Sequence, residues 1–324
     1  EATLKKIQTA IAELNYRPSN AARQLKTGHV PVFGLLVPSI TNPMFASLAR
    51  EIEIVAKKEY GYRLLLGNTY REKSEEVIFL DDLLSHGVRG VIVASSLADQ
   101  SHFQDAIDRG LTIVNYDCRS IEHNKQRISA DNISMNNYEA GKIVTRFLTD
   151  SGCRNLAFAT ASGKTTSRRD KIDGFLAAAE EAGLAKNVRI IEGKAESEYG
   201  DSELTELGLE LARKIAAIDD QRPDGVVAIN DMLAIGLLAG FRKCGISVPN
   251  DISLVGIDDM ILSALVSPAL TTVRPPVQEM ATLVVSRLMA RLKDPSIPVE
   301  DFLFTPTLVN RESVRVRDKM SAGL

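Results

Sequence analysis

The feature that most constrains this chain is a regular alternation between short apolar runs and longer segments with helical periodicity. Four apolar runs of strand length begin at residues 32, 62, 90 and 111, and they read VFGLLVP, YRLLLGN, GVIVASS and LTIVNYD. Segments with the spacing of amphipathic helices separate them, for example at 43–60 and 74–86. Runs this rich in Val, Ile and Leu, alternating with helices, indicate a parallel sheet covered by helices on both faces.

The same pattern then starts again. Further apolar runs begin at residues 155, 188, 225 and 253, and they read NLAFAT, VRIIEG, GVVAIND and SLVGIDD. We expect helices between them at 170–183, 202–217 and 232–243, and a last helix at 276–293. The sequence therefore predicts an α/β protein with two doubly wound parallel-sheet lobes in series. Segments as late as the last helix are expected to cross back and complete the first lobe.

Polar residues gather just after the ends of the predicted strands. They are Ser95, Ser96, Asp117, Asn230, Asp231, Asp258 and Asp259. Ligands of open parallel sheets bind outside the carboxyl ends of the strands, so two facing lobes would line a shared cleft with these groups. The alternative for each single residue is helix capping, because Asn and Asp accept hydrogen bonds from the first free N–H groups of a helix.

Several classes of protein are disfavoured by the sequence. No stretch approaches the ~20 apolar residues that cross a bilayer, and charged residues interrupt the first segment, unlike a signal peptide. The three cysteines and four histidines lack the spacing of a disulfide framework or a metal site. "ASGKTTS" at 161–167 lacks the first glycine of a P-loop, and no G-x-G-x-x-G or G-x-S-x-G occurs. We therefore expect that the protein binds no cofactor and is not an enzyme.

Charge is unevenly distributed along the chain. Residues 1–29 hold five basic and two acidic residues, a net charge of +3, whereas the whole chain carries −3. A basic arm on an acidic body is what a protein needs when only the arm approaches a polyanion. The alternative is an ordinary solvated helix surface.

Several motifs, in order along the chain, resemble the lactose-repressor/galactose-repressor family of bacterial transcription regulators. Residues 14–25, LNYRPSNAARQL, are similar to the end of that family's DNA-binding headpiece. The likeness continues through SITNPMF at 39–45, AIND at 228–231, VPNDISLVGIDD at 248–259 and PALTTVRPP at 268–276. The resemblance implies a periplasmic-binding-protein-like body, preceded here by the remnant of an all-α headpiece and a hinge helix.

The resemblance also implies how the amino-terminal segment contacts DNA. A short hinge helix of the family inserts a leucine into the minor groove and kinks the duplex. The positions that match this helix are Asn20, Ala22, Arg23 and Leu25. The helix-turn-helix that reads the major groove in the family is expected to lie before Glu1, so that the chain is truncated relative to the family.

Effector contacts are implied in the same way. The positions that match the family's effector-binding residues are Met44, Phe45, Ser95, Asp117, Ser167, Arg169, Lys171, Asn230 and Asp258. Lys171 stands where the family has an arginine, which keeps the charge but loses the planar fork of donors. The hydrogen-bonding groups suit a molecule dense in hydroxyl groups, so a sugar or sugar derivative is the leading hypothesis. The two basic residues also allow a sugar acid or phosphate, and a purine is disfavoured because few aromatic faces are available.

Taken together, the sequence predicts a cytoplasmic, homodimeric transcription regulator, a repressor, that binds near-palindromic operator DNA under the control of a small carbohydrate effector. The expected domains are the headpiece and hinge at 1–28, the first lobe at 29–130 and 276–304, and the second lobe at 131–275 and 305–318. A sugar-binding protein of a transport system is the main alternative. The hinge motif and the absence of an export signal from the sequence disfavour it.

Overall fold

The computed structural model of the 324-residue chain describes residues 2–13, 30–95, 97, 99–117, 128–162, 165–194 and 203–315. Helix α1 (Ala2–Glu13) is the only described part of the expected headpiece. The four predicted DNA contacts, Asn20, Ala22, Arg23 and Leu25, lie outside the described residues.

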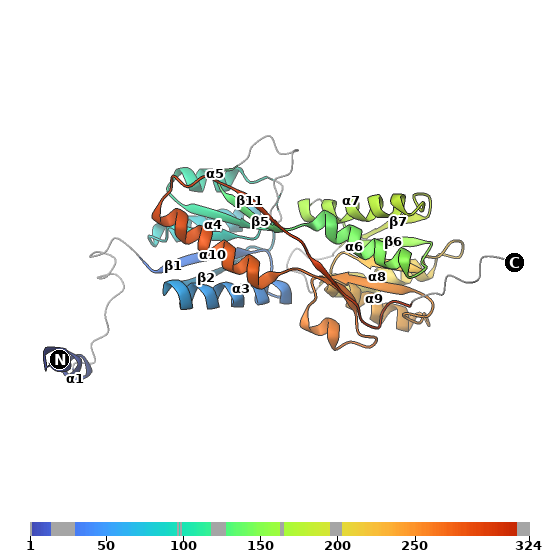
Figure 1. Cartoon of the computed structure of the whole chain (residues 1–324), viewed down its shortest axis with the longest axis horizontal. Helices are drawn as coiled ribbons and strands as arrows, with labels where there is room; N and C mark the ends of the chain where they lie inside the picture. Colours follow the sequence, from blue (N-terminus) through green and yellow to red (C-terminus); the bar gives the residue numbers. More distant parts are fainter. Residues whose placement is uncertain are drawn as a thin grey trace.

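Two α/β lobes lie end to end along the long axis of the molecule (Figure 1). The first contains β1 (Val32–Val37), α3 (Pro43–Val55), η1 (Ala56–Tyr60), β2 (Arg63–Asn68), α4 (Lys73–Ser85), β3 (Gly90–Val93), α5 (Ser101–Asp108), β4 (Thr112–Tyr116), β5 (Asp131–Met135), α10 (Val277–Lys293) and β11 (Asp301–Phe304). Its six strands are all parallel, in the order β11-β5-β4-β3-β1-β2.

The second lobe repeats this plan. It contains α6 (Asn137–Asp150), β6 (Leu156–Ala161), α7 (Thr166–Glu181), β7 (Val188–Gly193), α8 (Glu203–Ala216), β8 (Gly225–Ala228), α9 (Asp231–Lys243), β9 (Ser253–Ile257), η2 (Ile261–Ala264), β10 (Thr271–Arg274) and β12 (Thr307–Val309). Its strand order is β12-β10-β9-β8-β6-β7, and only β12 is antiparallel to its neighbour. The predicted fold class is confirmed.

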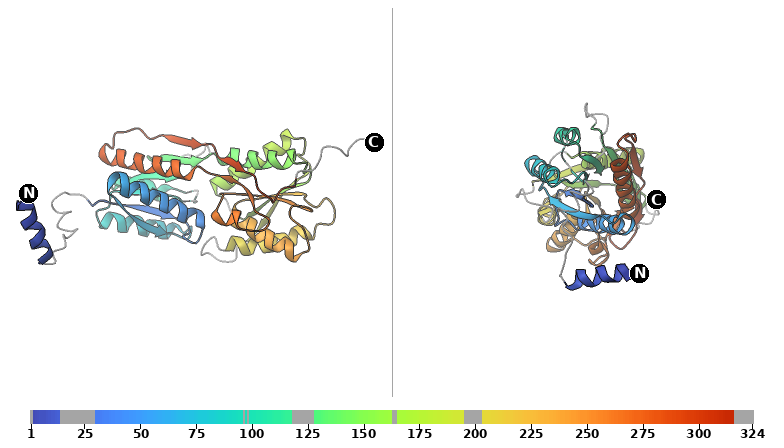
Figure 2. Two further views of the ribbon diagram at one scale, coloured as in Figure 1. Left: turned by 60° about the horizontal axis from the view of Figure 1, so that its bottom comes forward. Right: turned by 90° about the vertical axis from the view of Figure 1, so that its left-hand side faces the viewer.

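Alternating side chains of the strands divide each lobe into two apolar layers. In β1, Phe33 and Leu35 pack with residues of α3 and α10, while Leu36 packs with residues of α4 and α5. In the second lobe, α6 and α7 pack together on one side of the sheet, and α8 and α9 on the other. Figure 2 shows the same layering from two further directions. This coverage of both faces is why the strands read as continuous apolar runs.

The chain crosses between the lobes three times, after β5, between β10 and α10, and between β11 and β12. Although they come late in the chain, α10 and β11 belong to the first lobe. The boundary expected after residue 130 needs correction. Strand β5, at Asp131–Met135, pairs with β4 and β11 and therefore belongs to the first lobe.

Strand β5 is not predicted by the pattern of apolar runs, because three of its five residues are polar. Their partners come from distant parts of the chain. Asp131 is fully buried and accepts hydrogen bonds from Nε and Nη2 of Arg287, each at 3.0 Å. Asn132 accepts from Asn115 at 2.9 Å and donates to Asp301 at 2.7 Å. A strand whose polar groups are all satisfied inside the protein gives no apolar run to recognise.

Candidate binding site between the lobes

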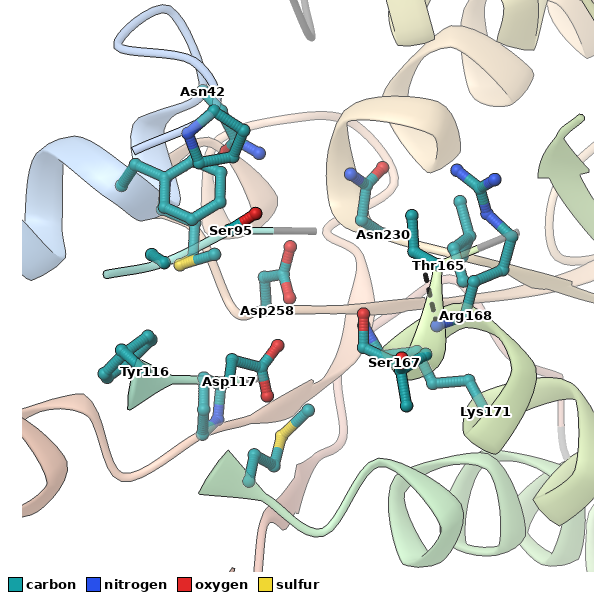
Figure 3. A pocket seen from close by; sticks show the side chains of 18 of the residues that line it. Asn42, Ser95, Tyr116, Asp117, Thr165, Ser167, Arg168, Lys171, Asn230 and Asp258 are labelled. Atoms are coloured by element: carbon teal, nitrogen blue, oxygen red, sulfur yellow. Dashed lines mark hydrogen bonds between the residues drawn. The ribbon is translucent and has the colours of Figure 1, made fainter. Parts of the chain in front are cut away.

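A cleft of about 1080 Å³, counted with its open mouth, separates the two lobes. The carboxyl ends of β3 and β4 supply its first-lobe wall, and those of β8 and β9 supply part of its second-lobe wall. Polar side chains from both lobes face it (Figure 3). This is the position where open parallel sheets bind ligands.

Three of the described helices that begin at the cleft, α3, α7 and α9, have a capping side chain there. Asn42 Oδ1 accepts a hydrogen bond from the N–H of Met44 at the start of α3. Thr165 Oγ1 accepts from Arg168 N–H at α7, and Asn230 Oδ1 accepts from Leu233 N–H at α9. Neither α3 nor α7 has an acidic residue in its first turn, so no side chain of these turns offsets the partial positive charge of the helix end.

The structure brings nearly all the predicted effector residues into this cleft. Those that line it are Met44, Phe45, Ser95, Asp117, Ser167, Lys171, Asn230 and Asp258. Arg169 is the exception: it is exposed and does not line the cleft, whereas its neighbour Arg168 does. The reason is helical phase, because residues 168 and 171 are three apart and share a face of α7, while residue 169 points elsewhere.

Asp117 occupies the end of β4 in a left-handed backbone conformation, with φ at 55°. Its Oδ1 accepts hydrogen bonds from Ser134 Oγ and Asn137 Nδ2, both at 2.9 Å. Burial raises the pKa of the Asp117 carboxyl, whereas the charge of Lys171, these two hydrogen bonds and a third from the backbone of Met135 act in the opposite direction. The side chain is thus an acceptor that its neighbours hold in place at the wall of the cleft.

Two other polar side chains that line the cleft, Tyr116 and Lys171, are also largely buried. Tyr116 precedes Asp117, is 3 % exposed, and has a pKa raised by burial and by the charges of Asp117 and Asp258. Lys171 is only 8 % exposed, although it lines the cleft. Among the described residues, its ammonium group has no ion-pair or hydrogen-bond partner. It interacts with Asp117 only electrostatically, at longer range.

The polar pairs after β8 and β9, Asn230-Asp231 and Asp258-Asp259, contain three acids whose separate roles the sequence does not distinguish. Asp258 lines the cleft, whereas Asp259 forms ion pairs with Arg274 and Arg311, each at 2.5 Å. Asp231 is fully buried behind the cleft wall and accepts hydrogen bonds from Ser263, Thr272 and the N–H of Met260. Asp259 and Asp231 thus hold neighbouring segments together, and neither lines the cleft.

Sequence patterns missed several residues of the lining. They include Asn42, Arg71, Gln100, Tyr116, Met135, Thr165 and Met280. Two of them had a usable signal, since Asn42 and Thr165 precede helical segments as capping residues do. Met280 had none: it belongs to the apolar face of α10 and reaches the cleft only because α10 returns to the first lobe.

Comparison with known proteins agrees with this architecture. Residues 145–314 match the family model described as a periplasmic binding protein-like domain. The chain is 31% identical to the HTH-type transcriptional repressor PurR of Photobacterium profundum over 316 residues, which cover 97% of the chain and 90% of that protein. It is 30% identical to the ribose operon repressor of Haemophilus influenzae, over 96% of the chain and 89% of that protein.

The chain belongs to the LacI family of bacterial transcription regulators. Among solved structures, it is similar to a periplasmic binding protein/LacI transcriptional regulator from Alkaliphilus metalliredigens, complexed with D-xylulofuranose. The TM-score is 0.76 at 26% identity, covering 88% of this chain and 99% of that one. In this LacI-family chain, none of the described helices is long and apolar enough to cross a membrane.

Proposed function

We propose that this LacI-family regulator is a cytoplasmic repressor whose affinity for a near-palindromic operator is set by a sugar or sugar derivative bound between its lobes. The observation that carries the proposal is the cleft itself, in which acceptors and donors from both lobes face one space. Two relatives support the class of ligand, one named a ribose operon repressor and the other holding D-xylulofuranose. We infer that the ligand is bound without being converted.

The arrangement of polar groups fits a polyhydroxylated molecule. Asp117 and Asp258 can accept hydrogen bonds from hydroxyl groups. Asn230 uses its side-chain oxygen to cap α9, so it offers the cleft its amide N–H groups, rather than both a donor and an acceptor as the sequence alone suggested. Apolar walls from Phe45, Met135 and others cover the carbon face of a sugar ring. A flat aromatic ligand would have to stack on Phe45 or Tyr116, both in the first lobe.

Binding can be transmitted because the ligand would touch both lobes. A ligand that binds one arrangement of the lobes more tightly shifts the population toward that arrangement. The only covalent links between the lobes among the described residues are the three crossovers after β5, β10 and β11. Rotation about them moves the first lobe, to which the amino-terminal DNA-binding segment is joined, and so changes the fit to the operator.

The proposal is tested by measuring operator affinity with and without ligand. DNA selected on the protein expressed from its complete reading frame should contain near-palindromic sites. A sugar that binds the cleft should change affinity for those sites. Asp117→Asn, which removes the charge but keeps the shape, should weaken sugar binding roughly tenfold to a hundredfold, since hydrogen bonds to charged groups contribute about 1.5–3 kcal/mol.

Operator affinity of the unliganded Asp117→Asn variant should remain that of the wild type, which separates the effector site from DNA binding. A protein that selects no DNA sequence, or whose operator affinity is indifferent to every sugar found to bind, would disprove the proposed function. Release of a chemically altered sugar after incubation would instead indicate an enzyme.

Two exposed apolar patches support the proposed homodimer. Ile261, the first residue of η2, and Leu265, the residue that follows η2, are 77% and 73% exposed. In the first lobe, the edge strand β2 exposes Leu65 and Leu66. An exposed apolar edge strand promotes aggregation unless something covers it, and a second copy of the chain in an isologous pair would do so.

We therefore expect the double variant Ile261→Lys/Leu265→Lys to sediment as a monomer at micromolar concentration, where the wild type sediments as a dimer. The control is Leu176→Lys, which introduces one charge at an exposed leucine of α7. It should remain dimeric. A wild type that is monomeric, or a double variant that is still dimeric, would contradict the assignment of η2 to the interface.

A further inference from the structure

The charge of the cleft is the starting point for an inference about the effector. Its described lining contains three basic side chains, Arg71, Arg168 and Lys171, against two acidic ones, Asp117 and Asp258. The first turns of α3 and α7, which also open on the cleft, add positive partial charge that no acidic residue of their own offsets. The cleft is therefore positive on balance, whereas the whole chain carries −3.

Among these basic residues, Lys171 gives the strongest indication of an anionic ligand. Its side chain is more than nine-tenths buried and lines the cleft, yet no described residue pairs with its ammonium group. Burying a charge without a partner is costly. Asp117, across the cleft, lies beyond ion-pair distance and already accepts hydrogen bonds from Ser134 and Asn137. Because no described residue supplies that partner, the ammonium group can pair with an anionic group of a ligand.

The neighbours of Lys171 extend the same chemistry. Thr166 and Ser167 form the first turn of α7 and line the cleft, one turn before Lys171 on the same helix. The first N–H groups of a helix have no partner within the helix, and they bind anions readily. Figure 3 shows Ser167 and Lys171 next to each other, with the carboxylates of Asp117 and Asp258 on the other side of the space. Both ends of the cleft are therefore polar, and the two ends carry opposite charges.

We propose that the effector is an anionic sugar, carrying a phosphate ester or a carboxylate, whose charged group binds Lys171, Ser167 and the amino-terminal end of α7. The hydroxyl groups of the sugar then bind Asp117 and Asp258 at the other end. This proposal rests on the proposed function of the cleft as the effector site and specifies the class of ligand. It assigns to Lys171 an ion pair that no described residue provides.

The first experiment compares a neutral sugar with its charged derivatives in phosphate-free buffer. Calorimetry would use D-ribose, D-ribose 5-phosphate and D-ribonate, and in parallel D-glucose, D-glucose 6-phosphate and D-gluconate. We expect a charged member of at least one series to bind about ten- to a hundredfold more tightly than its neutral parent. The phosphate and carboxylate arms distinguish a sugar phosphate from a sugar acid.

Two variants test whether Lys171 is responsible. Lys171→Met keeps the length of the side chain and removes its charge. Arg169→Met removes one charge from the same turn of α7, but Arg169 is exposed and does not line the cleft. The preference for the charged sugar should fall below about threefold in Lys171→Met and should persist in Arg169→Met.

The second experiment does not depend on the identity of the sugar. Inorganic phosphate at millimolar concentration should raise the midpoint of thermal unfolding of the wild type and of Arg169→Met, but not of Lys171→Met. The inference is overturned if phosphate has no effect that depends on Lys171. It is also overturned if neutral sugars bind as tightly as their charged derivatives. A neutral sugar that alters operator affinity at the same or a lower concentration than its charged derivatives would support the proposed function while refuting this inference.

Discussion

Replacement of Gly141 by alanine is expected to destabilise the second lobe by about 3 kcal/mol and to weaken ligand binding as well, because α6 and α7 touch backbone to backbone. A Cβ atom at Gly141 would lie 2.1 Å from the carbonyl oxygen of Lys171. The contact is reciprocal, since a Cβ atom at Gly174 would lie 2.0 Å from the carbonyl oxygen of Tyr138. Backbone atoms cannot turn aside, so the helices must separate.

This separation would move the very turn of α7 that presents Lys171 to the cleft. Gly141→Ala should therefore lower both the free energy of unfolding, measured in urea, and the stabilisation of the protein by inorganic phosphate. Gly90→Ala is the control. There a Cβ atom would meet only side-chain methyl groups, the nearest being Leu292 Cδ1 at 3.0 Å. Flexible side chains can yield, so the control should lose less than about 1.5 kcal/mol. Equal losses in both variants would refute the argument.

The second large effect concerns Asp231 and pH. Burial raises the pKa of Asp231 to about 6 in the folded protein, although Ser263, Thr272 and the N–H of Met260 donate hydrogen bonds to it. The carboxyl is tightly enclosed, since a Cβ atom at Gly256 would lie 2.1 Å from Asp231 Oδ1. Asp231→Asn keeps the shape of this side chain and removes its titration.

The folded pKa of Asp231 lies above its ordinary value of 3.8, so between these values the folded state binds more protons than the unfolded state. The contribution of Asp231 to stability is thus fully present below pH 3.8 and is lost as the pH rises through about 6. A shift of this size corresponds to about 3 kcal/mol. The free energy of unfolding of the wild type, relative to that of Asp231→Asn, should fall by about this amount between pH 4 and pH 7.

Urea denaturation of both proteins at a series of pH values measures this difference, and comparing the two proteins cancels the titration of all other groups. A difference that is constant with pH would mean that Asp231 keeps an ordinary pKa. A difference that grows as the pH rises would mean that the hydrogen bonds outweigh burial and hold the pKa of Asp231 below 3.8. Because Asp231 does not line the cleft, sugar binding at pH 7 should be changed little in Asp231→Asn if the variant is folded.

Secondary structure could be predicted from the sequence wherever the burial of side chains follows a regular pattern along a segment. Strands such as β1 and β8 are apolar throughout because helices cover both faces of the sheet, and α10 shows its buried face every three or four residues. Strand β5 could not be predicted in this way, because its polar side chains are buried against specific partners from distant parts of the chain. Arg287 lies 156 residues away from Asp131, and no local pattern can indicate that such a pair will meet.

The sequence by itself determined the two-lobed α/β architecture, the order of its main elements and the edge at which polar side chains gather, since these follow from periodicity and from local caps. Only the tertiary structure decided what each polar side chain does. Of two successive acids after β9, Asp258 faces the cleft and Asp259 binds two arginines. Of two successive arginines on α7, Arg168 and not Arg169 lines it. Neighbours in sequence point to different sides of the backbone, and only the packing of distant elements determines which side is the cleft.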